Sequence, residues 1–98
     1  MENVVIVATI KIKEEFVSEV YKELLTLHRL THEKDAGCLQ YDLHQDSKDK
    51  NTYVFIETWE SQDFLDQHEK KDHFVSFVSK VEKKIEGLDI SKLKKIKA

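Results

Sequence analysis

Residues 33–74 read EKDAGCLQYDLHQDSKDKNTYVFIETWESQDFLDQHEKKDHF, and this stretch decides the fold. Gly37 stands where a turn from helix to strand needs a residue that tolerates positive φ. After it, residues 38–45 and 52–59 read as strands, and the polar run 46–51 between them predicts a hairpin turn. The stretch therefore predicts the end of one helix, a β-hairpin and the start of a second helical region.

Upstream of this stretch, the chain predicts a strand followed by a helix. Residues 4–12 are short and rich in β-branched side chains, as in a strand, with one face formed by Val4, Ile6, Ala8, Ile10 and Ile12. Residues 14–32 change to a helical period, with an apolar stripe formed by Phe16, Val20, Leu24 and Leu27. Within 38–45, the alternation predicts Leu39, Tyr41 and Leu43 on one side of the strand.

Downstream, two helical segments precede a last segment of uncertain type. Ser61 is the predicted N-cap of a short helix that carries Phe64, Leu65 and His68. A further helix is expected near Asp72, with an apolar stripe from Phe74 to Ile85 and Gly87 as its end. Residues 88–96 do not alternate cleanly, so both a bulged strand and a short helix are open there.

The resulting order, β-α-β-β-α-β, is the ferredoxin-like α+β arrangement, with helices on one face of an antiparallel sheet. At 98 residues, the chain 1–98 is expected to form a single domain, since two cores would be too small to be stable separately. Strands 4–12 and 52–59 carry apolar residues on both faces, yet the helices can cover only one. A second copy of the sheet is the simplest cover for the other face, which predicts a homodimer.

Composition and charge exclude several classes of function. The net charge is −3 and the charges are interleaved, so no basic stripe for nucleic acid is expected. The single cysteine allows no intramolecular disulfide and no cysteine-based metal cluster. The first apolar run has no basic leader and is too short to span a membrane, so cytoplasmic residence with no membrane contact is expected.

Glu57 and Trp59 are candidate site residues because they share one strand face with Tyr53 and Phe55. A carboxylate on an apolar face is costly unless it is hydrogen-bonded. Glu57 is therefore either a satisfied structural acceptor or the group that orients a pocket histidine. Trp59 either fills the core or forms the flat wall of an aromatic slot.

The histidines supply the other candidates. His68 lies on an apolar stripe and His73 directly precedes one, so both are either proton-transfer groups at a cavity or core and cap residues. His28 and His32 have the i, i+4 spacing of metal ligands, but no third ligand follows at a recognisable spacing. No metal site is therefore predicted.

The order and spacing of these features resemble the antibiotic biosynthesis monooxygenase family. The motifs are Glu33-x3-Gly37-Cys38-x2-Tyr41, Glu57-x-Trp59-Glu60-Ser61 and Leu65-x2-His68-x4-His73-Phe74. The resemblance implies a dimeric α/β barrel of two sheets packed back to back, and oxygenation of a small aromatic quinol-like or polyketide-like substrate. It implies no cofactor, with dioxygen as co-substrate. It also implies catalytic roles for His73, His68 and Glu57, with substrate contacts from Trp59, Tyr41, Phe74 and His28.

Two alternatives remain open at this stage. One is an isomerase of a small phosphorylated signal molecule, which wants polar and basic residues around the cavity where this chain offers Tyr, Phe and Trp. The other is a non-catalytic dimeric module that binds a small aromatic ligand, as in a stress response. Heme degradation fits less well, because such relatives use an Asn in the first strand and residues 4–12 contain none.

Overall fold

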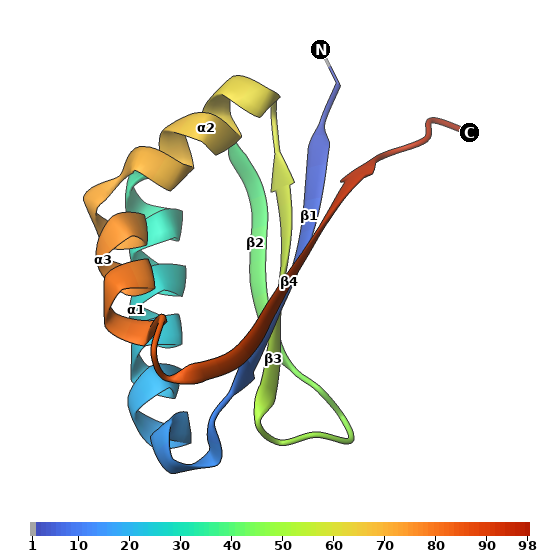
Figure 1. Cartoon of the computed structure of the whole chain (residues 1–98). Helices are drawn as coiled ribbons and strands as arrows, with labels where there is room; N and C mark the ends of the chain where they lie inside the picture. Colours follow the sequence, from blue (N-terminus) through green and yellow to red (C-terminus); the bar gives the residue numbers. More distant parts are fainter. Residues whose placement is uncertain (1) are drawn as a thin grey trace.

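The computed structural model describes residues 2–98 and has the predicted β-α-β-β-α-β order (Figure 1). The elements are β1 (Val4–Ile12), a short 3-10 helix η1 (Glu14–Phe16), α1 (Val17–Lys34), β2 (Cys38–Gln45), β3 (Thr52–Trp59), α2 (Gln62–Lys70), α3 (Asp72–Val81) and β4 (Ile85–Lys94). The four strands form one sheet in the order β2-β3-β1-β4, and each neighbouring pair is antiparallel. The ferredoxin-like fold is therefore confirmed.

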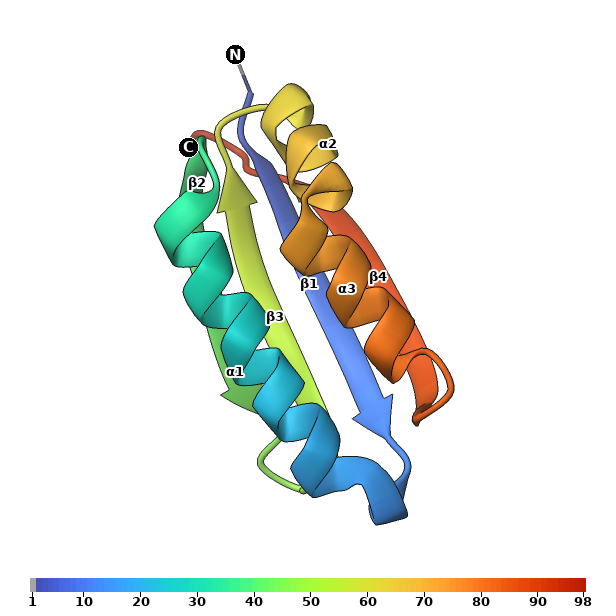
Figure 2. The ribbon, with the colours of Figure 1, turned by 90° about the vertical axis from the view of Figure 1, so that its left-hand side faces the viewer.

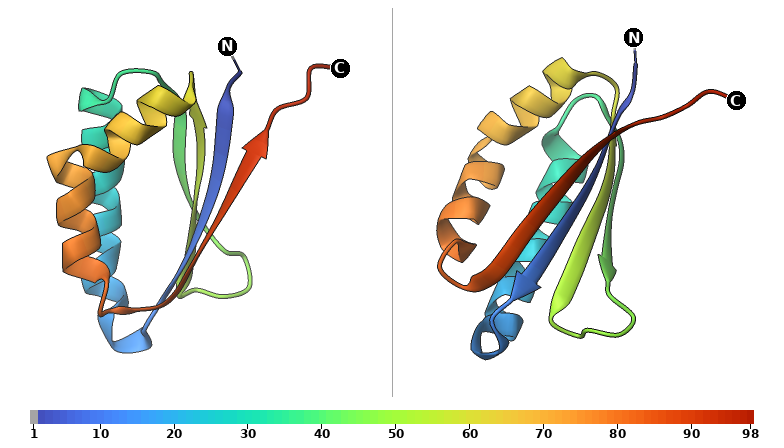
Figure 3. Two further views of the ribbon diagram at one scale, coloured as in Figure 1. Left: turned by 45° about the horizontal axis from the view of Figure 1, so that its top comes forward. Right: turned by 45° about the vertical axis from the view of Figure 1, so that its right-hand side comes forward.

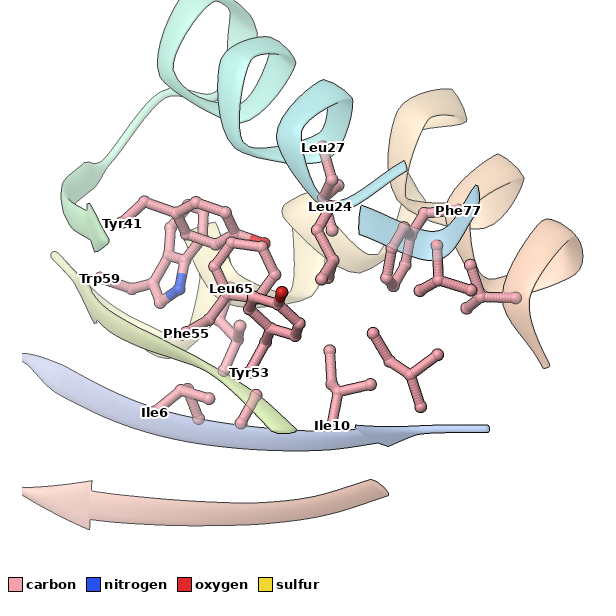
Figure 4. Packing of buried hydrophobic residues seen from close by; sticks show 14 residues of the cluster. Ile6, Ile10, Leu24, Leu27, Tyr41, Tyr53, Phe55, Trp59, Leu65 and Phe77 are labelled. Atoms are coloured by element: carbon pink, nitrogen blue, oxygen red, sulfur yellow. The ribbon is translucent and has the colours of Figure 1, made fainter. Parts of the chain in front are cut away.

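The molecule has two layers. All three α-helices lie on one face of the sheet, with α1 over the side of β2 and β3 and with α2 and α3 over β1 and β4 (Figure 2). The buried stripe of α1, Val20, Leu24 and Leu27, packs with the inward side chains of β1 and β3 (Figure 4). Full burial of each such side chain contributes roughly 1.5–3 kcal/mol. Because side chains alternate along β3, those of Tyr53, Phe55, Glu57 and Trp59 lie on the face of the sheet that the helices cover.

The outer face of the sheet has no cover among residues 2–98. It presents apolar side chains of β1 and β3 that are only partly buried: Val5, Val7, Val54 and Ile56. No helix in the same residues combines the length and the apolar composition needed to cross a membrane.

The structure corrects the predicted side of Leu39. The pairing of β2 with β3 shifts between Cys38 and Gln40, so Leu39 is the extra residue of a β-bulge. Cys38 faces Trp59 and Tyr41 faces Glu57, while Leu39 is 58% exposed. The prediction that Leu39 shares one side of the strand with Tyr41 and Leu43 is therefore wrong.

The C-terminal region also differs from the prediction. Helix α3 ends at Val81, so Ile85 opens β4 and Gly87 lies inside that strand opposite Lys11. Residues 88–94 pair regularly with β1, so the last segment is a strand and not a helix. The register shift of this pair lies before it, between Lys11 and Ile12, where Glu86 is the extra residue of a bulge. Ser61 is the N-cap residue of α2, as predicted, but its side chain makes no capping hydrogen bond.

Strand β4 diverges from the helical layer along the edge of the sheet (Figure 3). Leu88 and Ile90 pair with Ile10 and Ala8, so they share the inward face, yet they are 55% and 54% exposed. The space between sheet and helices is therefore open on this edge.

Candidate functional site

A cavity of about 80 Å³ lies between the sheet and the helices. Its walls are mostly apolar and come from all four strands and all three α-helices. The polar side chains in its lining are Tyr41, Glu57, His68 and Glu69, and the exposed pair Leu88 and Ile90 stands at its open edge. Small-molecule sites have this composition, a largely apolar wall with few polar groups.

His68 is the buried imidazole of this cavity. It projects from α2, its side chain is 2% exposed, and its Nδ1 is hydrogen-bonded to Oδ2 of Asp35. A carboxylate only accepts, so Nδ1 carries the proton and Nε2 presents a lone pair. Nε2 is buried and has no hydrogen-bond partner among residues 2–98. The arrangement leaves one imidazole nitrogen free to accept a proton inside the cavity.

The Gly37 turn brings Asp35 to His68. Asp35 follows the last residue of α1, and its N–H donates to the carbonyl of Thr31. Gly37 has φ +73°, and a Cβ there would lie 2.2 Å from Cγ of Phe64 on α2. The turn therefore lets α2 close tightly against the end of α1, which joins two residues that are 33 positions apart.

His73 lies on the other side of the same carboxylate. It sits in the first turn of α3, and its Nε2 is 2.8 Å from Oδ1 of Asp35. The two atoms are not aligned for a hydrogen bond, and neither has another partner among residues 2–98. His73 is not part of the cavity lining, so its contact with the site runs through Asp35.

Glu57 is the second ionisable group of the cavity wall. Nε1 of Trp59 donates to its Oε1 over 2.9 Å. The pKa of Glu57 is raised to about 7, chiefly because the side chain is buried; the Trp59 hydrogen bond opposes this shift and nearby Glu69 adds to it. The predicted role of Glu57 as orienter of a histidine is not what the structure shows, because Asp35 holds that position at His68.

Aromatic rings hold His68 in place. Trp59 is fully buried, and its ring centroid lies 4.6 Å from that of His68. Tyr41 and Phe74 meet the imidazole edge-on at 5.4 Å and 4.9 Å (Figure 4 shows Tyr41 and Trp59 together). Burial lowers the pKa of His68, although Asp35 partly offsets this, so the imidazole stays neutral near pH 7. Trp59 thus backs the base, and it is Tyr41 and Phe74 that line the cavity.

His28 does not join these residues. It lies in a wider groove of about 320 Å³ between α1 and the hairpin, beside Tyr21, Leu43 and Tyr53. Its ring is 6.5 Å from that of Tyr41, but His28 is not part of the cavity lining. The structure therefore groups Tyr41, Glu57, His68 and Phe74 at the cavity, places Trp59 and His73 behind it, and leaves His28 outside.

Sequence reasoning missed Asp35, whose carboxylate accepts a hydrogen bond from Nδ1 of His68. One signal was available: an acidic residue at the C-terminal end of a helix is unfavourable to the helix dipole and calls for a partner. Glu69, Leu88 and Ile90 were missed as well, since only the packing of α2 and β4 brings them to the cavity. Asp35, His68 and His73 also place donor atoms within 4.8 Å of one another, a set that could hold a metal ion.

Comparison with known proteins gives consistent matches over this fold. The sequence profile of the antibiotic biosynthesis monooxygenase family matches residues 3–80. The chain is 36% identical over 81 residues to "Putative monooxygenase YcnE" of Bacillus subtilis (strain 168), covering 79% of this chain and 80% of that protein.

Solved structures agree with this result. PA3566 from Pseudomonas aeruginosa has a TM-score of 0.92 at 30% identity, covering 99% of this chain and 97% of that one. A protein of Caulobacter crescentus CB15, described as a putative antibiotic biosynthesis monooxygenase, has a TM-score of 0.91 at 25% identity. That match covers 98% of this chain and 92% of the other.

Proposed function

This chain belongs to the antibiotic biosynthesis monooxygenase family, and on that basis we propose that it is a cofactor-independent monooxygenase of a small, quinol-like aromatic ring. The observation that carries the proposal is the environment of the His68 imidazole. His68 lines an apolar cavity, its Nε2 is buried and has no hydrogen-bond partner among the described residues, and Asp35 holds Nδ1. This is the geometry of a general base that waits for an acidic proton.

The proposed reaction begins with proton transfer from a ring hydroxyl to Nε2 of His68. The resulting phenolate is electron-rich and reacts directly with dioxygen. A quinol supplies all the electrons itself: one oxygen atom enters the ring, the other leaves as water, and the product is a hydroxyquinone. The apolar walls orient the ring and exclude bulk water.

Glu57 is proposed to handle the second proton. With a pKa of about 7, it is present both as acid and as carboxylate at neutral pH. The acid form can protonate an oxygen anion that forms on the other side of the ring. Two groups whose pKa values are pushed in opposite directions by their surroundings commonly divide acid and base roles.

The size of the cavity bears on how the ring binds. At about 80 Å³ it is smaller than the roughly 150 Å³ of an engineered protein cavity that holds benzene. The reacting edge of the ring would therefore lie at His68, with the rest extending toward the open edge at Leu88 and Ile90. The lining includes no lysine or arginine, which disfavours a phosphorylated substrate and hence the isomerase alternative.

Oxygen consumption by metal-stripped protein tests the proposal. A panel of quinols is used, with correction for spontaneous oxidation. We expect saturable uptake that falls about 10²- to 10⁴-fold in His68→Gln, the usual contribution of a general base. His44→Gln is the matched control, since His44 is an exposed histidine of β2 outside the cavity lining. Full uptake in a folded His68→Gln protein, or binding of quinols with no turnover, would contradict the proposal.

A further inference from the structure

Asp35, His68 and His73 form a compact buried cluster where α1, α2 and α3 meet. Their side chains are 1%, 2% and 7% exposed. Asp35 comes from the end of α1, His68 from α2 and His73 from the first turn of α3. Donor atoms of the three residues lie within 4.8 Å of one another. Two imidazoles and one carboxylate thus face each other in a region from which water is largely excluded.

The hydrogen bonding of this cluster is incomplete. Oδ1 of Asp35 and Nε2 of His73 are 2.8 Å apart but make no hydrogen bond, and neither has another partner among residues 2–98. Buried polar atoms are nearly always paired, because an unpaired one costs free energy. A carboxylate oxygen and a ring nitrogen that lie this close, with no hydrogen bond between them, can both ligate one cation.

We propose that this cluster binds a divalent first-row transition-metal ion such as Zn²⁺. The ligands are Nδ1 of His68, Nε2 of His73 and the carboxylate of Asp35, with water completing the coordination. Imidazole together with carboxylate suits Zn²⁺ and its neighbours in the row. Mg²⁺ and Ca²⁺ prefer oxygen ligands throughout, so this donor set selects against them.

The bound ion lies behind the cavity. Neither Asp35 nor His73 lines the cavity, so the imidazole of His68 separates the ion from any substrate. When the ion occupies Nδ1, the proton of the neutral imidazole moves from Nδ1 to Nε2, and no proton is lost overall. Nε2, which has no hydrogen-bond partner among residues 2–98, then changes from acceptor to donor.

Metal binding at this cluster therefore inhibits the enzyme. This consequence rests on the proposed function, in which Nε2 accepts a proton, whereas metal binding itself does not. The two can be measured separately, because Trp59 is the only tryptophan of the chain and its ring lies 4.6 Å from that of His68. Its fluorescence reports on His68 with no need for turnover.

The first arm of the test titrates EDTA-stripped protein with Zn²⁺, Co²⁺ and Mg²⁺. We expect a saturable change in Trp59 fluorescence with one Zn²⁺ per chain, visible Co²⁺ absorption typical of nitrogen and oxygen ligands, and no response to Mg²⁺. Equal responses to Zn²⁺ and Mg²⁺, or no Co²⁺ absorption, would overturn the site. These readings use the unaltered chain, so they stand even if a variant fails to fold.

The second arm compares two histidine variants. His73→Gln removes one ligand and is expected to weaken Zn²⁺ binding by about tenfold or more. His28→Gln is the matched control. It removes one histidine of the i, i+4 pair His28 and His32 on α1, whose ring centroids lie 4.4 Å apart. If His28→Gln weakens binding and a folded His73→Gln does not, the metal is held on α1 and the proposal is wrong.

The activity arm separates the two proposals. Both proposals are supported if Zn²⁺ inhibits quinol oxidation, if EDTA reverses the inhibition, and if His73→Gln weakens inhibition and Zn²⁺ binding to the same extent. Zn²⁺ that binds but leaves oxygen uptake unchanged overturns the inhibition and keeps the site. A chain that binds Zn²⁺ but oxidises no quinol with or without it contradicts the proposed function alone.

Discussion

His68 and Glu57 show how burial sets opposite protonation states in one cavity. The same desolvation lowers the pKa of the histidine, whose charged form is the acid, and raises that of the glutamate, whose charged form is the base. Near pH 7 the imidazole is neutral and the carboxyl group is close to its midpoint. Near pH 7, neutral His68 can thus accept a proton while the acid form of Glu57 can donate one.

Glu57 also makes stability depend on pH. Its pKa is about 7 in the folded chain against an ordinary value of 4.5, so the folded state binds this proton more tightly. The stabilisation is full below about pH 4.5 and is lost as pH rises through 7. A shift of this size corresponds to about 3 kcal/mol. We predict that Glu57→Gln, which cannot ionise, removes this decline.

Urea unfolding at pH 5, 6, 7 and 8 measures the effect. The free energy of unfolding of the unaltered chain should fall relative to that of Glu57→Gln across this range. Glu60→Gln, which alters an exposed carboxylate beyond the end of β3, should follow the unaltered chain. Parallel curves for Glu57→Gln and the unaltered chain would show that Glu57 is not buried as a neutral acid.

The turn between α1 and β2 brings α1 and α2 together at the site. Its glycine combines a positive φ with a close approach of Phe64, and its carbonyl accepts the N–H of Glu60 over 2.8 Å. Gly87, by contrast, has no atom within 4 Å of the place where a Cβ would be. The chain's two glycines therefore form a matched pair for substitution.

We predict that Gly37→Ala lowers the free energy of unfolding by more than about 2 kcal/mol. The left-handed conformation alone costs roughly 1–2 kcal/mol for a residue with a Cβ, and Phe64 must also move. Gly87→Ala should stay within about 0.5 kcal/mol of the unaltered chain, as expected for an unhindered surface position. Equal unfolding midpoints in urea for the two variants would contradict this account of the turn.

The strands were predictable because the alternation of apolar and polar residues is a local property of the sequence. The structure differs from the prediction where a feature depends on contacts between distant segments. Residues 4–12, 38–45 and 52–59 match β1, β2 and β3 residue for residue. The bulge at Leu39 and the placement of Gly87 depend on pairing with a neighbouring strand, which a single strand does not encode. Asp35 depends on the contact of two helices and was found only in three dimensions.

The two-layer architecture leaves one face of the sheet uncovered among residues 2–98. Val7 and Ile56 pair across β1 and β3 on this face, and neither is fully buried within one chain. We propose that a second copy covers it, as the two-sided apolar pattern predicts. Since the site faces the helices, such a dimer leaves the cavity intact.

We predict that Ile56→Lys gives a monomer, because it would bury an unpaired charge at the interface. Sedimentation velocity at micromolar concentration measures the result, with Ser76→Lys as control, since it adds the same charge at an exposed position of α3. The unaltered chain and the control should both sediment as dimers. A monomeric unaltered chain would refute the dimer proposal.

The tautomer of His68 tests the central claim most directly. Nitrogen-15 NMR of metal-stripped protein at pH 7 distinguishes a protonated ring nitrogen from one with a lone pair, and loss of the signals in His68→Gln assigns them. We predict a neutral ring with the proton on Nδ1, held by Asp35, and a bare Nε2. A proton on Nε2, or a fully protonated ring, would contradict the base that the whole account assigns to this cavity.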